Sequence, residues 1–349
     1  MTEVAATPLS LGYRMPAEWE QHEATWISWP DRNGQSFPES YDRVVPALIG
    51  MAAALAESEI LRINISSPEQ EREVRTLLAP VVPMERVEIF DIPTNEPWCR
   101  DHGPIFVKRS VPPTLAVNDF GYNAWGGKYP PFAADDIVPT TIAKRFGLPL
   151  FEPGFILEGG SVDPNGSGAL LTTASCLLNP NRNPSFSREE IEQGLRDYLG
   201  VDQILWLGDG IEGDDTDGHV DDITRFVARS TVVTVVEPDC SDPNHKPLEA
   251  NLQRLSSMTL ADDTPLSVVE LPMPPRIERE GLRLPASHAN FYIANTTVLL
   301  PAFGGVSDQI AASLLADLFP TRKILPIDCR ELIWGLGAFH CLTQQQPVC

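Results

Sequence analysis

The chain has 349 residues, of which 42% are hydrophobic and 21% charged, and its formal net charge at pH 7 is −22. This composition supplies a full core and excludes a disordered chain, and the acidic balance disfavours nucleic acid or anionic lipid as partners while suiting a cationic ligand. No apolar run reaches the ~18 residues of a transmembrane helix, and residues 1–14 lack the pattern of a secretory signal, so we expect a cytoplasmic protein with no membrane partner.

Helical periodicity recurs along the chain. Apolar residues spaced three and four apart predict helices at 39–57, 135–147, 187–199, 247–260 and 307–319, with an extra helical stretch near 68–78. Ser187 and Ser307 precede acidic residues at the starts of two of these segments, which is typical of an N-terminal cap.

Short β-rich segments lie between the predicted helices. They span 60–66, 87–92, 105–108, 115–120, 169–173, 225–228, 231–236, 291–294 and 297–301. Turn-forming residues at 163–168, 229–230 and 294–296 predict hairpins. The succession of helix, strand and hairpin recurs about every 50 to 60 residues over the C-terminal two thirds, which predicts a cyclic α/β array of about five modules.

The domain organisation follows from the absence of a linker. The 33 prolines are spread along the whole chain, and no segment separates two composition classes. We therefore predict one catalytic domain, residues 1–349, with two lobes divided near Pro149 as the alternative.

Cys341 differs from the other cysteines in its surroundings. The six cysteines show no Cys-x-x-Cys spacing, so free thiols are expected, most of them buried. Cys341 stands among Gly, His, Thr and Gln residues, which favours an exposed loop with polar partners and a nucleophilic role. The alternative is a core cysteine at the end of a strand.

His219 lies in a turn crowded with acidic residues. These are Asp214, Asp215, Asp217, Asp221 and Asp222. Neighbouring carboxylates raise the pKa of an imidazole, which suits a general acid. Two alternatives remain open: His219, Asp217 and Asp221 could bind zinc or another divalent metal, or the segment could be a solvated loop.

Two further acidic residues stand beside glycines. Asp101 precedes Gly103 and a predicted strand, where its carboxylate can face a pocket, pair with Arg100 or cap the turn. Glu158 follows an apolar run and precedes Gly159 and Gly160, so its charge needs a partner: His219, a bound cation or a structural ion pair. Trp98 could stack on a cation or pack in the core.

The combination of these groups is more informative than any one of them. A planar guanidinium pairs with carboxylates in bidentate fashion, and a thiolate can attack its electrophilic carbon. A histidine can then protonate the departing ammonia and later deprotonate water. The residues thus indicate covalent chemistry on a guanidine.

The chain resembles a known family at several motifs. The segments Trp-Cys-Arg-Asp-His-Gly-Pro, Phe-Gly-Tyr-Asn-Ala-Trp-Gly-Gly-Lys-Tyr, Leu-Glu-Gly-Gly-Ser, Thr-Ala-Ser-Cys-Leu-Leu-Asn-Pro-Asn-Arg-Asn-Pro, Gly-Asp-Asp-Thr-Asp-Gly-His-Val-Asp-Asp and His-Cys-Leu-Thr-Gln-Gln-Gln-Pro occur in order over residues 14–347. They resemble the agmatine deiminase family, which includes the Porphyromonas-type peptidyl-arginine deiminases. The resemblance implies the pentein fold, a five-bladed pseudo-symmetric α/β propeller.

The resemblance also implies roles for individual residues. Cys341 would form a covalent amidino intermediate, and His219 would act as acid and then base. Asp101 and Asp221 would hold the guanidinium, and Glu158 would support His219 or the substrate. The pocket walls and the far end would be supplied by Trp98, Trp125 and Asp215. The family needs no metal and no organic cofactor.

Two segments depart from the family pattern. Leu336, Ala338 and Phe339 interrupt the glycine-rich approach to Cys341, and Glu96-Pro97-Trp98-Cys99 replaces the commoner Trp-Ala form. Both changes affect the expected pocket walls, so the resemblance does not predict which chemical group the substrate carries at the end away from the guanidine.

The resulting functional prediction is a hydrolase of the carbon–nitrogen bonds of a linear amidine. It would convert agmatine and water to N-carbamoylputrescine and ammonia in polyamine (putrescine) metabolism. A peptidyl-arginine or other guanidine deiminase is the alternative. A metal-dependent hydrolase and a non-catalytic sensor of cationic amines are the competing classes, and a homo-oligomer is left open.

Overall fold

The computed structural model describes residues 6–349, and its principal sheets repeat one pattern. In each repeat an antiparallel pair of strands is followed by a helix and then by a strand parallel to the second. A parallel neighbour cannot be reached by a tight turn, so the helix provides the crossover connection. This unit occurs five times.

The second to fifth units follow one another along the chain. The second has β4 (Ile105–Lys108), β5 (Leu115–Asn118), α6 (Val138–Phe146) and β6 (Leu150–Phe151). The third has β7 (Val162–Pro164), β8 (Ala169–Thr173), α8 (Arg188–Leu199) and β9 (Gln203–Leu207). The fourth has β10 (Thr224–Ala228), β11 (Thr231–Val236), α9 (His245–Ser256) and β12 (Ser267–Pro272). The fifth has β15 (Tyr292–Ile293), β16 (Thr297–Ala302), α10 (Val306–Leu318) and β17 (Lys323–Asp328).

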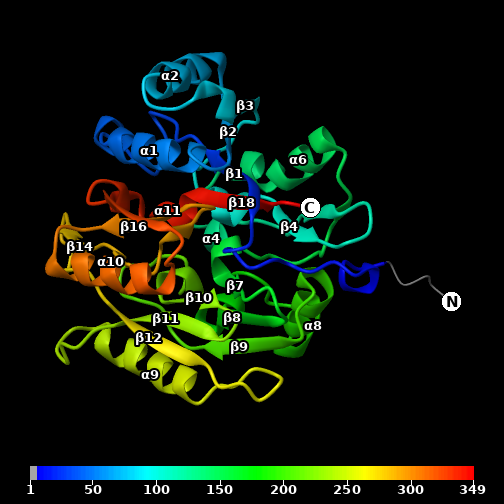
Figure 1. Ribbon diagram of the computed structural model, residues 1–349, viewed down its shortest axis with the longest axis vertical. Helices are drawn as coiled ribbons and strands as arrows, with labels where there is room; N and C mark the ends of the chain where they lie inside the picture. Colours follow the sequence, from blue (N-terminus) through cyan, green and yellow to red (C-terminus); the bar gives the residue numbers. More distant parts are fainter. Residues whose placement is uncertain (1–5) are drawn as a thin grey trace.

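The first unit contains the first and the last strand of the described chain. It has β1 (His22–Ser28), α1 (Tyr41–Ala56), β2 (Ile60–Ile65), α2 (Pro68–Leu78) and β3 (Val87–Asp91), and it is completed by β18 (Thr343–Pro347). β18 runs antiparallel to β1, with Trp26 opposite Gln344. The five units follow one another around a common centre (Figure 1), which confirms the predicted five-bladed α/β propeller.

The helices cover the outer parts of the sheets because each has one apolar face. In α1, Val44, Leu48 and Met51 recur at helical spacing and are buried in one cluster with Leu61 and Ile63 of β2. No helix among residues 6–349 is both long and apolar enough to cross a bilayer.

The centre of the molecule is polar. The Glu18 carboxylate forms ion pairs with Arg100 at 3.2 Å and Arg225 at 3.0 Å, and it lies 2.8 Å from the Nε2 atom of His340. All four side chains are buried, and a buried charge is tolerated when it is paired and hydrogen-bonded. One member of this network, His340, directly precedes Cys341 in the chain.

Most predicted elements agree with the structure, and the exceptions have physical reasons. All three predicted hairpins form, and Ser187 caps α8 in a capping box with Glu190. The predicted cap at Ser307 is wrong: α10 begins after Gly305 because the Asp308 carboxylate accepts the preceding backbone N–H groups.

β18 was not predicted because its sequence, Thr-Gln-Gln-Gln-Pro, is polar. The strand is nevertheless fully buried. Its glutamines bond across the centre: Gln345 accepts from Arg100 at 2.8 Å, and Gln346 accepts from Trp26 Nε1 at 3.0 Å. A buried strand is normally recognised in a sequence by its apolar residues. β18 lacks them because its side chains form hydrogen bonds with other buried polar groups instead.

Candidate active site

Cys341 lies in a short helix, α11 (Phe339–Leu342), immediately before β18, and it lines a cavity of about 340 Å³. It is 5% exposed and belongs to a buried hydrophobic cluster, so the expected exposed loop is wrong and the alternative of a core cysteine beside a strand holds. The residue nevertheless lines the cavity. The Sγ atom lies 3.0 Å from Asn290 Nδ2 and 3.8 Å from Asp221 Oδ2. The sulfur therefore stands between an amide donor and a carboxylate.

The electrostatic environment keeps this thiol protonated in the free protein. Burial raises the pKa of Cys341 well above its usual value, and the nearby carboxylates of Asp221, Asp222 and Asp101 raise it further, against the hydrogen bond from Asn290. A thiolate at this position would be surrounded by like charge. A cation that enters the site reverses this condition, because it favours the ionised sulfur.

His219 is completely buried at the start of the short turn Val220–Asp222, so the alternative of a solvated loop is wrong. Its Nδ1 atom lies 3.7 Å from Asp101 Oδ1. Burial alone would lower the pKa of His219, but Asp101, the Cys176 thiol and Asp221 outweigh it and raise the pKa well above the usual value. The imidazole is therefore protonated at neutral pH and can act as an acid.

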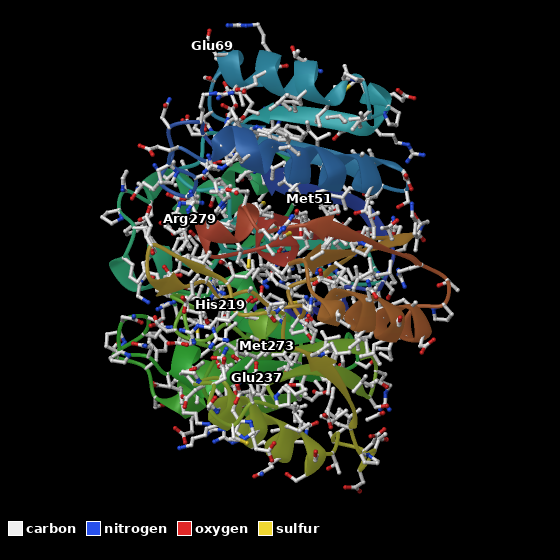
Figure 2. The ribbon with its side chains drawn as sticks, turned by 90° about the vertical axis from the view of Figure 1, so that its left-hand side faces the viewer. Met51, Glu69, His219, Glu237, Met273 and Arg279 are labelled. Carbon is white, nitrogen blue, oxygen red and sulfur yellow. The ribbon has the colours of Figure 1, made fainter. Side chains whose placement is uncertain are left out.

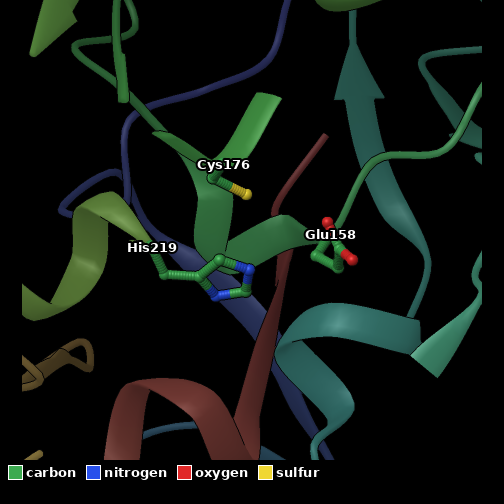
Figure 3. A group of neighbouring side chains, drawn as sticks. All are labelled: Glu158, Cys176 and His219. Atoms are coloured by element: carbon green, nitrogen blue, oxygen red, sulfur yellow. The ribbon is translucent and has the colours of Figure 1, made fainter. Parts of the chain in front are cut away.

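His219 and two neighbouring side chains form the arrangement in Figure 3. The Cys176 sulfur, a nitrogen of His219 and a carboxylate oxygen of Glu158 lie within 4.8 Å of one another and face a common space. The molecule is turned by 90° in Figure 2, where His219 lies near mid-height, whereas Glu69 of α2 lies at the upper end. The chemistry-bearing groups thus gather deep inside the fold.

Asp101 lies in a short helix, α3 (Cys99–His102), and its two oxygens have different partners. Oδ1 accepts the backbone N–H of Gly160 at 2.9 Å, and Oδ2 accepts Trp125 Nε1 at 3.0 Å. Arg100 instead pairs with Glu18, so the alternative of an Arg100–Asp101 salt bridge is wrong. The carboxylate is held in place by a peptide group and an indole.

Gly160 allows three polar groups to converge. A Cβ atom at this position would lie 2.6 Å from His219 Nδ1, 2.8 Å from Asp101 Oδ1 and 3.0 Å from Asp221 Oδ2. These contacts are shorter than van der Waals separations, so no side chain fits. The glycine predicted to permit close backbone approach is therefore the point at which loops from separate units meet.

Asp221 is oriented by a residue that sequence reasoning did not single out. Its Oδ2 lies 2.6 Å from His340 Nδ1, and the other ring nitrogen of His340 contacts Glu18. Burial opposes ionisation of Asp221, but the hydrogen bond and charge of His340 lower its pKa below the usual value. Its Oδ1 is buried and has no hydrogen-bond partner within residues 6–349, so that oxygen is free to accept from a ligand.

Glu158 is fully buried and forms an ion pair. Its Oε1 accepts Arg182 Nε at 2.6 Å, and Arg182 also contacts Asp217 at 2.6 Å. Asp217 pairs in addition with Lys128. The proposed metal ligands His219, Asp217 and Asp221 are therefore not brought together. The groups with ligand spacing are Glu158, Cys176 and His219, and Asp221, Asp222 and Cys341, and Arg182 already supplies positive charge to the first.

Trp98, Trp125 and Asp215 all line the cavity that contains Cys341 and Asp101. The Asp215 carboxylate accepts the hydroxyl of Tyr129. Trp125 has a left-handed backbone, with φ of 55°, which turns its indole towards Asp101. The three residues that the resemblance assigned to the walls and the far end thus face one space.

Several residues of the site gave no local signal in the sequence. Asn290 contacts both Cys341 and Asp222, and Glu18 reaches the site only through His340. Cys176 and Arg182 lie in one of the motifs of the resemblance, but nothing in their spacing predicts contact with His219 or Glu158. Each of these contacts joins residues that lie far apart in the sequence, so local patterns could not predict it.

The comparisons with known proteins identify one family. The model of the family "Porphyromonas-type peptidyl-arginine deiminase" matches residues 14–347. A Legionella pneumophila (strain Paris) protein named "Putative agmatine deiminase" is 36% identical over 97% of this chain and 97% of its own length.

Solved structures agree as well. The agmatine deiminase of Enterococcus faecalis superposes with a TM-score of 0.91 at 34% identity, covering 99% of this chain and 98% of that one. A serine variant of C. jejuni agmatine deiminase with substrate bound gives a TM-score of 0.87 at 29% identity, covering 96% of each chain.

The fold and these matches define a hydrolase of the class that modifies guanidino groups. Within that class, the chain belongs to the Porphyromonas-type peptidyl-arginine deiminase family.

Proposed function

We propose that this protein is an agmatine deiminase that hydrolyses agmatine to N-carbamoylputrescine and ammonia, with residues 1–349 acting as one catalytic domain. The observation that carries the proposal is that Cys341 and Asp101 line one cavity, while the Asp221 carboxylate and the buried His219 ring lie next to them. Full-length relatives named as agmatine deiminases support the choice of substrate.

The guanidinium binds between two carboxylates. Asp101 and Asp221 each accept N–H donors from the planar cation, and the unpartnered Oδ1 of Asp221 gains its hydrogen bond in this way. The substrate carbon is thereby brought beside the Cys341 sulfur. The same positive charge lowers the pKa of the thiol, which releases its proton to solvent.

The first half of the reaction forms a carbon–sulfur bond. The Cys341 thiolate attacks the guanidinium carbon, and the protonated His219 donates its proton to the departing nitrogen. The carbon–nitrogen bond breaks, ammonia leaves, and an amidino group remains on the sulfur. Glu158 lies beside His219, and the ion pair with Arg182 holds the Glu158 carboxylate in place.

The second half returns the enzyme to its starting state. Neutral His219 removes a proton from water, and the resulting hydroxide attacks the amidino carbon. The carbon–sulfur bond breaks, the hydroxyl proton of the tetrahedral adduct passes to the departing Cys341 sulfur to restore the thiol, and the neutral ureido product dissociates. The sum is one guanidinium and one water converted to one urea group and one ammonium ion.

Intact-protein mass spectrometry tests the proposal. The protein is mixed with agmatine, quenched in acid and weighed, with Cys341→Ala as the control. We expect an amidino adduct on Cys341 and release of ammonia, neither of which appears in the control. Turnover of an arginine peptide without turnover of agmatine would transfer the proposal to the peptidyl-arginine alternative, and full loss of activity on exhaustive chelation would exclude this mechanism.

A further inference from the structure

A buried carboxylate without a cationic partner lies in the wall of the cavity. Glu96 stands between β3 and α3, is 4% exposed and lines the same cavity as Cys341. Its Oε1 has no hydrogen-bond partner in the part of the chain that the structure describes, and none of the ion pairs within residues 6–349 involves it. A buried carboxylate in this condition is costly unless a ligand supplies the missing donor.

Burial raises the pKa of Glu96 to about 7, with a hydrogen bond from Ser36 opposing the shift and the neighbouring Asp135 adding to it. Ionisation of Glu96 is therefore incomplete in the free protein at neutral pH. A cation beside its free oxygen would stabilise the charged form.

Trp98 connects the region of Cys341 to Glu96. A Cβ atom on Gly337 would lie 3.0 Å from the Cβ of Cys341 and 2.6 Å from Cζ3 of Trp98, so this edge of the indole adjoins the nucleophile. The opposite edge of the ring carries Nε1, which donates to Ser36 Oγ at 3.0 Å. The Ser36 hydroxyl in turn donates to the Glu96 carboxylate. One indole thus separates the reacting end of the cavity from Glu96.

Other charged groups of the cavity wall already have partners. The Asp215 carboxylate accepts the Tyr129 hydroxyl, and the Asp215 carbonyl accepts Lys128. Arg283 is paired with Glu212 at 3.0 Å and with Asp242 at 2.6 Å. Among the charged wall groups within residues 6–349, Glu96 is the one that has a buried carboxylate oxygen without a hydrogen-bond partner.

We propose that Glu96 binds the ammonium group at the far end of the substrate and so selects a guanidine with a terminal amine. The inference rests on the proposed deiminase function and names the residue that recognises the tail. The methylene chain of agmatine packs along the Trp98 ring, and the terminal ammonium donates to the Glu96 carboxylate. A carboxylate near the same end, as in free arginine, would meet like charge.

A comparison of two substrates with two variants tests this proposal. n-Butylguanidine has the guanidine and methylene chain of agmatine but lacks the amine. In Glu96→Gln we expect kcat/KM for agmatine to fall about 10- to 100-fold, mainly through KM, because a charged hydrogen bond is lost. The value for butylguanidine should change less than about threefold. Glu69→Gln, which removes the same charge from an exposed position on α2, should change neither.

Two outcomes overturn the inference. One is an equal loss for both guanidines in Glu96→Gln, which indicates damage to the whole cavity. The other is removal of the preference for agmatine by Asp215→Asn while Glu96→Gln keeps it. Should Glu96→Gln not fold, Glu96→Asp provides the same comparison with the charge retained, and it must still prefer agmatine. Failure of the proposed function looks different, because then the unmodified protein releases ammonia from neither guanidine.

Discussion

The two ends of the cavity differ in how their charges are held. At the end with Cys341, Asp101 is fixed by Gly160 and Trp125, and Asp221 is fixed by His340. At the other end, one oxygen of Glu96 has no partner within residues 6–349. The first arrangement is organised before a substrate arrives and suits any guanidinium, whereas the second gains a partner only from a particular substrate.

This difference separates the chemistry from the choice of substrate. Substitutions at the Cys341 end should affect every guanidine alike, and substitutions at the Glu96 end should change the preference among guanidines. Agmatine and n-butylguanidine therefore form a useful pair of probes.

Removal of the nucleophile should abolish turnover of both guanidines. We expect Cys341→Ala to lower kcat by about 10⁴-fold or more, because no other described thiol adjoins both Asp221 and Asn290. Agmatine should still bind, since Asp101 and Asp221 remain. Ammonia release and titration calorimetry measure the two quantities, and a rate within tenfold of the unmodified protein would contradict the assignment.

Removal of the Asp221 charge should have opposite effects on turnover and on thiol reactivity. We expect Asp221→Asn to lower kcat/KM about 10³-fold for both guanidines, because a group that stabilises the bound cation is lost. The same carboxylate raises the pKa of Cys341, so the free variant should be alkylated by iodoacetamide faster at a fixed pH. Mass spectrometry of Cys341 follows the rate, and slower alkylation would show that Asp221 does not control the thiol.

A single methyl group at Gly160 should disturb the reacting end. In Gly160→Ala the new carbon would press on His219, Asp101 and Asp221, and we expect kcat/KM to fall about 10²-fold for agmatine and butylguanidine alike. The matched control is Gly50→Ala in α1, where the added carbon meets only Ile327 at 3.5 Å. A change in the ratio of the two substrates would argue that Gly160 also shapes the far end.

The pH dependence of kcat/KM for agmatine should be bell-shaped, with limbs of about tenfold per pH unit. The rate rises as the Cys341 thiol ionises and falls as His219 loses its proton. Because both pKa values are raised, His219 stays protonated through neutral pH and the maximum lies on the alkaline side of neutrality. The alkaline limb should be absent from the residual activity of His219→Gln. A profile that rises without a maximum would show that His219 is not the general acid.

Much of the fold could be predicted from local patterns. Helical spacing located α1, α8, α9 and α10, and turn-forming residues located the hairpins, because these signals depend on neighbours within a few positions. β18 escaped prediction because its glutamines bond to Arg100, Arg62 and Trp26, which lie far away in the chain. The polar centre that makes such a strand stable exists only in the folded protein.

Local sequence patterns were sufficient to predict the repeating α/β units and to find a thiol, an imidazole and several carboxylates, which the family resemblance linked to a guanidine. The folded chain was needed to show which acidic residue contacts which partner: Asp217 pairs with Arg182, Asp221 pairs with His340, and Glu96 lines the cavity. Ionisation and recognition depend on burial and on the nearest charges, and these are set by distances through space.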